Sequence, residues 1–268
     1  KEISEKLELK KNQLLEINKI ISETDLLQNL ILKSGYAKKY WNSIIPFSNL
    51  TEKTIKNEYS FPKRIALFPG VSCMFYCGFC GRNQKAKYPL NIVSDSLEMY
   101  KKLFDESPEY TSYSVSGGLE PLTNPKLGEL VDHANLKRIK LPIITNGYSL
   151  TEGFLDKNPG VWKADSLRIS LYGVDEDSYE FITRVRKGFK QVYSNSISFL
   201  KKRNEKNKSM KFGFNFIIIP ENLHQLLEIP KLVKNINDEV KNGQGVNFLT
   251  LRDDYQSVTD HSLNRDTE

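Results

Sequence analysis

Three cysteines, Cys73, Cys77 and Cys80, lie within eight residues, and the 268-residue chain contains no others. An odd number of thiols at such tight spacing does not suit a disulfide framework. Cysteine thiolates are ligands for soft metal centres, and the C-x3-C-x2-C spacing lets one compact loop present all three to an iron–sulfur cluster. The spacing therefore predicts a cluster site in a reducing compartment.

A fourth cysteine ligand is missing. A [4Fe–4S] cluster normally takes one cysteine on each iron, so one iron here would keep an open position for a ligand that the protein does not supply. Phe75, Tyr76 and Phe79 would shield such a cluster from water. A zinc site with one added histidine, an electron-transfer ferredoxin and redox-sensing cysteines are the alternatives. No histidine lies near the cysteines in sequence; the three are His133, His224 and His261.

The cysteine motif is also recognisable as a whole. The stretch LFPGVSCMFYCGFCGRN (67–83) follows a predicted strand and carries an aromatic residue directly before the last cysteine. In this it resembles the radical S-adenosylmethionine (SAM) superfamily. The resemblance implies that SAM chelates the open iron of a [4Fe–4S] cluster and is reductively cleaved to a 5′-deoxyadenosyl radical, which abstracts hydrogen from a substrate. It also implies a one-electron reductant, such as flavodoxin or ferredoxin, as a partner.

Further candidate SAM contacts follow the next predicted strands. In the segment SGGLEP, the glycines Gly117 and Gly118 allow close backbone approach to a ligand. The resemblance places them and the Glu120 carboxylate at the amino end of SAM. Leu119 is one residue more than the family's GGEP-like segment has. The resemblance also suggests a cofactor contact for Asn146, for which an Asn-Gly turn is the structural alternative.

Polar residues recur on one side of two later strands. Strand alternation sends Arg168, Ser170 and Tyr172 to one side, and the resemblance places Ser170 beside SAM. Asn215 interrupts an apolar strand (FNFII) and could reach the ribose of SAM. Tyr172 falls at the mouth of the site as a candidate catalytic residue that contacts the substrate or relays a proton, with an aromatic plug as the alternative.

Two less specific candidates complete the cofactor set. Arg184 or Arg186 could pair with the SAM carboxylate; Arg184 is favoured, and a solvated helix face is the alternative. Leu249, with Phe248 and Leu251, could form an apolar wall against adenine, although core packing is the more common role of such residues.

Alternating strands and helices position these residues. Predicted strands span residues 64–68, 111–116, 141–145, 166–171, 211–219 and 246–251. Predicted helices span 94–106, 125–137, 151–158, 175–202 and, with an interruption near Pro230, 223–242. The alternation predicts an α/β fold of parallel βαβ units, a partial (β/α)6 barrel with its site at the carboxyl ends of the strands. No G-x-G-x-x-G follows the first strand, which disfavours a dinucleotide-binding sheet.

Residues outside the barrel are assigned by composition. Residues 1–63 are expected to form an N-terminal helical extension, 64–255 the radical SAM core, and 256–268 a polar tail from a truncated C-terminal part. Hydrophobic residues are 39% of the chain, and 39 Lys and Arg oppose 33 Asp and Glu with the signs interleaved. No apolar run approaches the roughly 20 residues that span a bilayer, and the charged N-terminal residues do not resemble a signal peptide, so a cytoplasmic protein without membrane contact is predicted. The mild net charge of +6 disfavours nucleic-acid binding.

The substrate is suggested by resemblance alone. The cysteine loop, the segment SGGLEPLTNPKLGELV and the ending FLTLRDDY resemble radical SAM enzymes that act on nucleotide-linked sugars, in particular TDP-4-amino-4,6-dideoxyglucose deaminase-like enzymes. This implies a small polar substrate, such as a nucleotide-linked (amino)sugar, and deamination, dehydrogenation or epimerisation. A radical SAM enzyme that modifies RNA or a peptide, and a non-catalytic Fe–S or zinc-binding module, are the alternatives.

Overall fold

The computed structural model describes residue 56 and residues 61–80 and 86–253. The predicted polar tail and nearly all of the predicted N-terminal extension lie outside these residues, so the predicted domain boundaries stay predictions. Within the described ranges, no helix is both long and apolar enough to cross a membrane.

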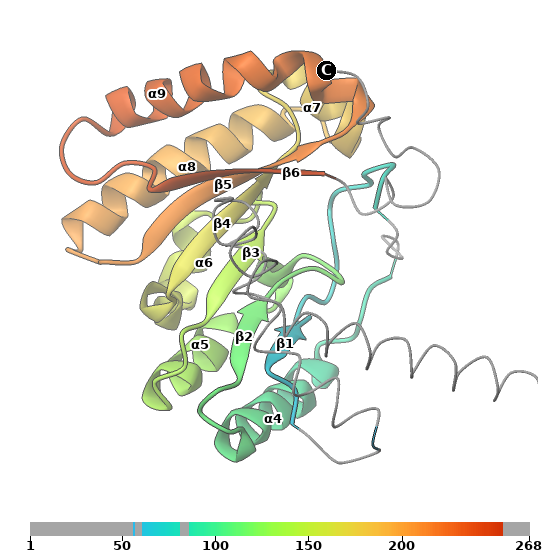
Figure 1. The fold of residues 1–268 in the computed structure, drawn as a ribbon, viewed down its shortest axis with the longest axis vertical. Helices are drawn as coiled ribbons and strands as arrows, with labels where there is room; N and C mark the ends of the chain where they lie inside the picture. Colours follow the sequence, from blue (N-terminus) through green and yellow to red (C-terminus); the bar gives the residue numbers. More distant parts are fainter. Residues whose placement is uncertain (1–55, 57–60, 81–85, 254–268) are drawn as a thin grey trace, which may run out of the picture. The chain divides into compact units, whose positions relative to one another are not determined.

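Six parallel strands form one sheet in the order of the sequence, β1-β2-β3-β4-β5-β6. The strands are β1 (Arg64–Leu67), β2 (Ser112–Val115), β3 (Pro142–Thr145), β4 (Ser166–Leu171), β5 (Lys211–Ile218) and β6 (Phe248–Asp253). The sheet is curved, with β1 and β6 at its two edges (Figure 1). Parallel neighbours joined through helices give the partial (β/α)6 barrel that the alternation predicts.

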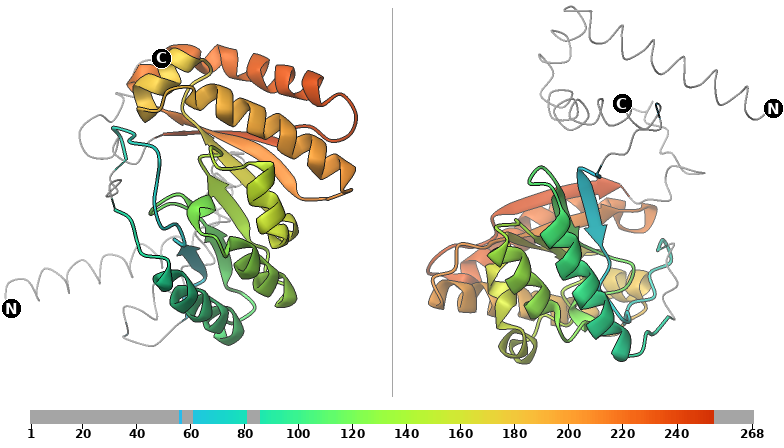
Figure 2. Two further views of the ribbon diagram at one scale, coloured as in Figure 1. Left: turned by 180° about the vertical axis from the view of Figure 1, so that it is seen from behind. Right: turned by 90° about the horizontal axis from the view of Figure 1, so that it is seen from below.

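The helices cover the outer side of the curved sheet and lie in front of it when it is viewed from behind (Figure 2). They are α4 (Asn91–Glu106), α5 (Leu127–Leu136), α6 (Glu152–Lys157), α7 (Glu176–Thr183), α8 (Gly188–Glu205) and α9 (Ile229–Val240). Short 3-10 helices are η1 (Pro121–Thr123), η2 (Pro159–Lys163) and η3 (Pro220–Glu228).

Two helix predictions need correction. The single helix predicted over 175–202 is interrupted between α7 and α8, where Arg184 and Lys187 take left-handed φ values of 61° and 57°. The segment predicted as one interrupted helix over 223–242 is the 3-10 helix η3 followed by α9. In both cases the backbone leaves α-helical geometry although helix-compatible residues continue, which periodicity alone does not reveal.

The sheet has two faces of different chemistry. One row of paired residues, which includes Val115, Ile143, Leu167 and Phe212, has no measurable exposure and packs against the helices. We call this side the helix face. The opposite side, here called the lumen face, carries the intervening residues, among them Arg168, and its polar positions are available to a ligand inside the barrel.

The edge strand β6 is held by a buried arginine. The Arg203 side chain on α8 is fully buried. Its guanidinium donates to Asn247 Oδ1 at 2.9 Å, Gly245 O at 2.9 Å and Met210 O at 3.3 Å, and it also contacts the carbonyl of Gln244. These bonds tie the turn before β5 to the segment before β6, because each buried carbonyl requires a donor.

Candidate functional site

The cysteine loop begins directly after β1 and rests on the segment that follows β2. Thr123 Oγ1 accepts hydrogen bonds from the backbone N–H groups of Val71 at 3.0 Å and Ser72 at 3.2 Å. Asn124 Nδ2 donates to Pro69 O at 3.0 Å. The residues just after the SGGLEP segment therefore position the loop that carries the three cysteines.

The far side of the loop is attached to α7. Tyr76 N donates to the carbonyl of Thr183 at 2.9 Å. The buried Phe75 ring meets Tyr148, Tyr172 and Tyr179 edge-on, with centroid separations of 5.7, 6.0 and 5.9 Å. Phe75 is thus an aromatic anchor of the loop, and the shielding of a cluster by the aromatic residues between the cysteines stays a prediction.

The three thiols suit a cluster that binds on the edge of the core. All three cysteines are free; Cys77 is buried, whereas Cys73 and Cys80 are half-buried. Burial raises the pKa of Cys73 to about 11, and it also raises the pKa of Cys77, on which the nearby charges of Cys73 and Cys80 act in the same direction. Neighbouring thiolates in this setting require cationic compensation, which the irons of a cluster would supply while displacing the protons.

The zinc alternative has no support in the described histidines. His133 Nε2 on α5 bonds Asp105 Oδ1 on α4 at 2.9 Å, and His224 is exposed on η3. Across the described residues, no three His, Cys, Asp or Glu side chains converge as a single ion requires. Cluster ligands need not converge in this way, because each cysteine binds a different iron.

Glu120 is held inside the protein by backbone and side-chain donors. It is 4% exposed, and its carboxylate accepts hydrogen bonds from Leu122 N at 3.0 Å, Asn146 N at 2.8 Å and the Thr145 hydroxyl. Burial raises its pKa, against the effect of these bonds. The carboxylate therefore links the SGGLEP segment to the end of β3, and its predicted contact with the SAM amino group stays a prediction.

Asn146 contacts the cysteine loop from the end of β3. Its Nδ2 lies 3.2 Å from Met74 Sδ and 3.9 Å from Cys73 Sγ, while its Oδ1 accepts from Tyr148 N at 3.0 Å. The structure thus brings Asn146 to the edge of the predicted cluster site, and it also shows the local turn that was the alternative.

The two glycines of SGGLEP differ in what they require. Gly118 has a φ of +110°, which side-chain-bearing residues rarely adopt, and a Cβ there would lie 3.1 Å from the Phe68 Cβ. Gly117 is exposed, and a Cβ added to it would meet nothing within 4 Å. The backbone explains glycine at 118, whereas nothing within the described residues explains it at 117.

This difference separates ligand contact from backbone strain. We expect Gly117→Val to leave the thermal unfolding temperature nearly unchanged and to weaken SAM binding by about 10-fold, because added bulk would occupy space that the ligand needs. Calorimetric titration of SAM into the cluster-loaded protein measures the affinity. Gly118→Ala is the comparison variant: its backbone is strained with or without a ligand, so its thermal unfolding temperature should fall. An unchanged SAM affinity in Gly117→Val would make the glycine pair a turn only.

Ser170 and Asn215 are neighbours on the lumen face. The register pairs Ser170 on β4 with Asn215 on β5. Asn215 is 2% exposed, and its Oδ1 has no hydrogen-bond partner among the described residues. A buried amide oxygen without a donor is rare in folded proteins. The hydroxyl groups of a SAM ribose would supply such a donor, so Asn215 fits the predicted cofactor.

The backbone just before Arg184 contacts the cysteine loop, but the Arg184 side chain packs on the ring of Phe181. The carbonyl of the preceding residue, Thr183, holds the loop. The exposed Arg184 guanidinium lies 4.9 Å from the centroid of Phe181, and Arg186 is paired with Glu180 at 3.4 Å. Within the described part of the chain, neither arginine side chain has an ion pair or ring contact with another predicted site residue, and a role toward the SAM carboxylate stays a prediction.

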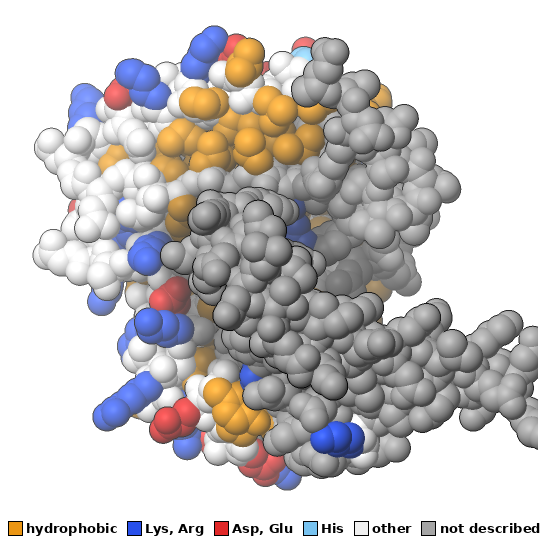
Figure 3. Space-filling view, in the orientation of Figure 1, with side chains coloured by type: hydrophobic (Ala, Val, Ile, Leu, Met, Phe, Trp, Pro, Cys, Tyr) orange, Lys and Arg blue, Asp and Glu red, His pale blue; other side chains and the backbone are white. Residues whose placement is uncertain are grey.

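Leu249 lies on the opposite side of the sheet from the other predicted contacts. The register pairs it with Phe214, on the helix face, whereas Asn215 pairs with Thr250. Leu249 and Leu251 are both exposed there, and hydrophobic side chains gather between α9 and β6 (Figure 3). The prediction that Leu249 walls the adenine is therefore corrected: on the last strand, the lumen face carries Phe248 and Thr250.

Tyr172 joins the cysteine loop to the lumen face. Its ring lies 5.5 Å from Phe79 and 5.8 Å from Tyr179, in addition to its contact with Phe75. Burial raises the pKa of its phenol well above the ordinary value, and nearby Cys77 adds to the effect. The phenol is therefore neutral at physiological pH and can donate a proton or a hydrogen bond.

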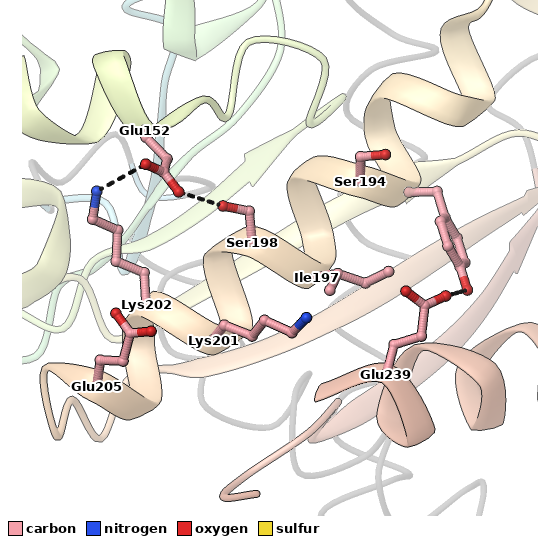
Figure 4. A pocket seen from close by; sticks show the side chains of 9 residues that line it. Glu152, Ser194, Ile197, Ser198, Lys201, Lys202, Glu205 and Glu239 are labelled. Carbon is pink, nitrogen blue, oxygen red and sulfur yellow. Dashed lines mark hydrogen bonds and ion pairs between the residues drawn. The ribbon is translucent and has the colours of Figure 1, made fainter. Parts of the chain in front are cut away.

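A groove on the outer surface is separate from this site. Figure 4 shows it between α6, α8 and α9. Three of its charged side chains have partners within the groove: Glu152 pairs with Lys202 at 3.5 Å and accepts from Ser198 at 2.9 Å, and Glu239 accepts from Tyr193 at 2.6 Å. It lies on the helix side of the sheet, away from the cysteine loop.

The fold and the site together define a class of protein. The sequence profile of the radical SAM superfamily matches residues 67–233, and the chain belongs to this superfamily. Radical SAM enzymes use a [4Fe–4S] cluster and SAM, so these two are the cofactors of this chain.

One curated relative is similar over most of this chain. The chain is 32% identical over 237 residues to the dTDP-4-amino-4,6-dideoxy-D-glucose ammonia-lyase of Streptomyces venezuelae, covering 87% of this chain and 49% of that enzyme. It thus spans about half the length of this curated relative.

Solved structures support the fold. Streptococcus suis SuiB bound to the precursor peptide SuiA superposes with a TM-score of 0.55 at 17% identity, over 79% of this chain and 45% of SuiB. The protein anSMEcpe with bound AdoMet and the Cp18Cys peptide gives a TM-score of 0.50 at 18% identity, over 71% of this chain and 50% of that one. The prediction of a partial radical SAM barrel is confirmed.

The structure adds residues that the sequence reasoning did not single out. Thr123, Asn124 and Thr145 support the cysteine loop and Glu120. The available signal was their position, since each lies inside or directly after a motif that was already recognised.

Proposed function

We propose that this chain is the catalytic core of a radical SAM enzyme that acts on a nucleotide-linked sugar, and that an aminosugar is the best candidate. The observation that supports this most is the 32% identity over 237 residues to an ammonia-lyase for a dTDP-linked aminosugar. Because the match covers 87% of this chain, it extends far beyond a single motif. Deamination, dehydrogenation and epimerisation are all within the reach of hydrogen abstraction from such a sugar.

Each group of residues has a proposed part in this function. Cys73, Cys77 and Cys80 hold the cluster, and the backbone at Gly117 together with Asn215 holds SAM. When bound, these cofactors supply reductive cleavage of SAM to a 5′-deoxyadenosyl radical. The phenol of Tyr172 faces the substrate, while the aromatic residues around it exclude water. A flavodoxin or ferredoxin in the reducing cytoplasm would supply the electron.

The experiment is a substrate panel. The protein is reconstituted anaerobically with iron and sulfide, supplied with a one-electron reductant and SAM, and mixed with individual nucleotide sugars. We expect 5′-deoxyadenosine to form faster with a dTDP-linked 4-aminosugar than without substrate. Equal, slow formation with every nucleotide sugar would contradict the proposed substrate class. Absence of SAM cleavage in a protein with a full cluster would contradict the enzymatic function itself.

Tyr172→Phe tests the substrate end of the site. We expect slow, substrate-independent SAM cleavage to persist and coupled turnover to fall by about 10-fold or more, because the variant loses a hydroxyl that can donate a proton. Both rates are measured in the same preparation. Tyr110→Phe, at an exposed tyrosine between α4 and β2, is the matched control. Equal coupled turnover would make Tyr172 structural, whereas a fall in both rates would place it at the cofactor.

A further inference from the structure

Three arginines share the lumen face with the candidate site. On β4, Arg168 lies two residues before Ser170 and on the same side of the sheet. On β6, Arg252 lies two residues after Thr250 and on the same side. Arg64 begins β1 and alternates with Leu67, which is on the helix face. None of the roles argued above uses these three side chains.

The Arg168 side chain reaches across the neighbouring strand. In the register, Arg168 pairs with Gly213, and Gly213 pairs with Phe248. The Arg168 Cζ lies 5.1 Å from the centroid of the Phe248 ring. A Cβ at Gly213 would lie 2.3 Å from Phe248 O. Because Gly213 has no side chain, β5 leaves room for the Arg168 side chain to reach Phe248. A guanidinium stacked on an aromatic ring is oriented while its N–H donors stay available to an anion.

Among the described residues, no carboxylate pairs with Arg64 or Arg168. None of the described strand residues on the lumen face is acidic. Partial burial and the charge of Arg64 both lower the pKa of Arg168, while burial and the charges of Arg168 and Arg64 lower that of Arg252. The positive charges of these arginines thus act on one another, and a bound anion would lower the repulsion between Arg64 and Arg168.

We propose that Arg64, Arg168 and Arg252 bind the diphosphate of a nucleotide-linked substrate, an inference that rests on the proposed function. Guanidinium groups match phosphate oxygens in pairs, and several of them suit a doubly charged diphosphate. Arg168 precedes Ser170 by two residues and Tyr172 by four, about 7 and 13 Å along the strand direction. A diphosphate at Arg168 leaves the attached sugar to extend toward Tyr172 and the cysteine loop.

Binding measurements on the full chain test this site without turnover. Thymidine diphosphate, inorganic pyrophosphate, thymidine and SAM are each titrated calorimetrically into the wild type and into Arg168→Gln. We expect Arg168→Gln to weaken thymidine diphosphate binding by about 10-fold or more, since it removes a charged donor pair. SAM affinity is expected to stay unchanged. Arg138→Gln, an exposed arginine after α5, removes the same charge and should bind all four ligands as the wild type does.

Two further variants guard against misfolding. Arg168→Lys keeps the charge and loses the paired geometry, so its affinity should fall between those of the wild type and Arg168→Gln. Arg64→Gln, at an exposed position, should weaken thymidine diphosphate binding with the thermal unfolding temperature unchanged. Variants that bind thymidine diphosphate normally would overturn the arginine site and leave the proposed function standing.

The remaining outcomes separate the two proposals. Pyrophosphate binding that depends on Arg168, without any binding of thymidine diphosphate, would support the arginine site and contradict a nucleotide-linked substrate. A fall in SAM affinity alone would overturn the proposal, because it would assign the arginines to the SAM carboxylate. Wild-type protein that binds neither diphosphate would also overturn it, and the substrate panel would then decide the proposed function independently.

Discussion

Cys77→Ala is expected to remove the visible cluster absorbance and to reduce SAM cleavage to background. Cys77 is the most buried of the three cysteines and the one on which the charges of both others act. Losing it leaves two ligands for a cluster that already lacks a fourth. Iron and sulfide content after anaerobic reconstitution, the absorbance spectrum and 5′-deoxyadenosine formation measure the effect.

A matched control exists in the same loop. Gly78 is exposed, and a Cβ there would meet nothing within 4 Å. Gly78→Ala should therefore retain the iron content and the SAM cleavage of the wild type. The free energy of unfolding of cluster-free Cys77→Ala should lie within about 1 kcal/mol of that of the cluster-free wild type, because the variant loses only one buried sulfur. A Cys77→Ala protein that still cleaves SAM would contradict the assignment of the three ligands.

Glu120→Ala is expected to destabilise the cluster-free protein by about 3 kcal/mol or more. The change leaves three buried donors without an acceptor, namely Leu122 N, Asn146 N and the Thr145 hydroxyl, and each such loss costs about 1–3 kcal/mol. SAM binding should fall as well, because Asn146 would lose its anchor beside Met74 and Cys73. Denaturant unfolding and SAM titration measure the two effects.

Glu120→Gln distinguishes a structural role from a direct contact with SAM. The amide keeps the side-chain volume and one oxygen acceptor, so the loss of stability should be smaller than in Glu120→Ala. If Glu120 acts only on the SAM ammonium group, both variants should keep their stability and lose SAM affinity, which would contradict the role as a link between segments.

The pH dependence of stability gives a second test of the Glu120 carboxylate. Its pKa is raised in the folded protein by burial. Below the ordinary pKa of a glutamate, the side chain is protonated in both the folded and the unfolded protein. As the pH rises, the unfolded protein ionises first, so the free energy of unfolding falls until the pH passes the raised pKa of the folded protein. The stability difference between the wild type and Glu120→Gln should therefore be largest at low pH and shrink as the pH rises.

Local patterns were sufficient for the elements that carry chemistry. The C-x3-C-x2-C spacing predicted the cluster loop after β1, and polar alternation correctly placed Ser170 and Asn215 on one face. These features depend on residues a few positions apart, where the strand period and the loop length restrict the geometry. The break between α7 and α8 was missed, because left-handed residues at Arg184 and Lys187 carry no glycine signal.

The sequence by itself determined the superfamily, the βαβ order and the identity of the three candidate cluster ligands, because residue type and short-range spacing encode them. Only the tertiary structure decided which face Leu249 occupies, what holds the Glu120 carboxylate, and that Arg168 reaches across Gly213 to Phe248. Each of these depends on the register between strands and on contacts between segments distant in sequence. A one-residue shift of register exchanges the two faces of a strand, and only packing of the whole barrel selects one.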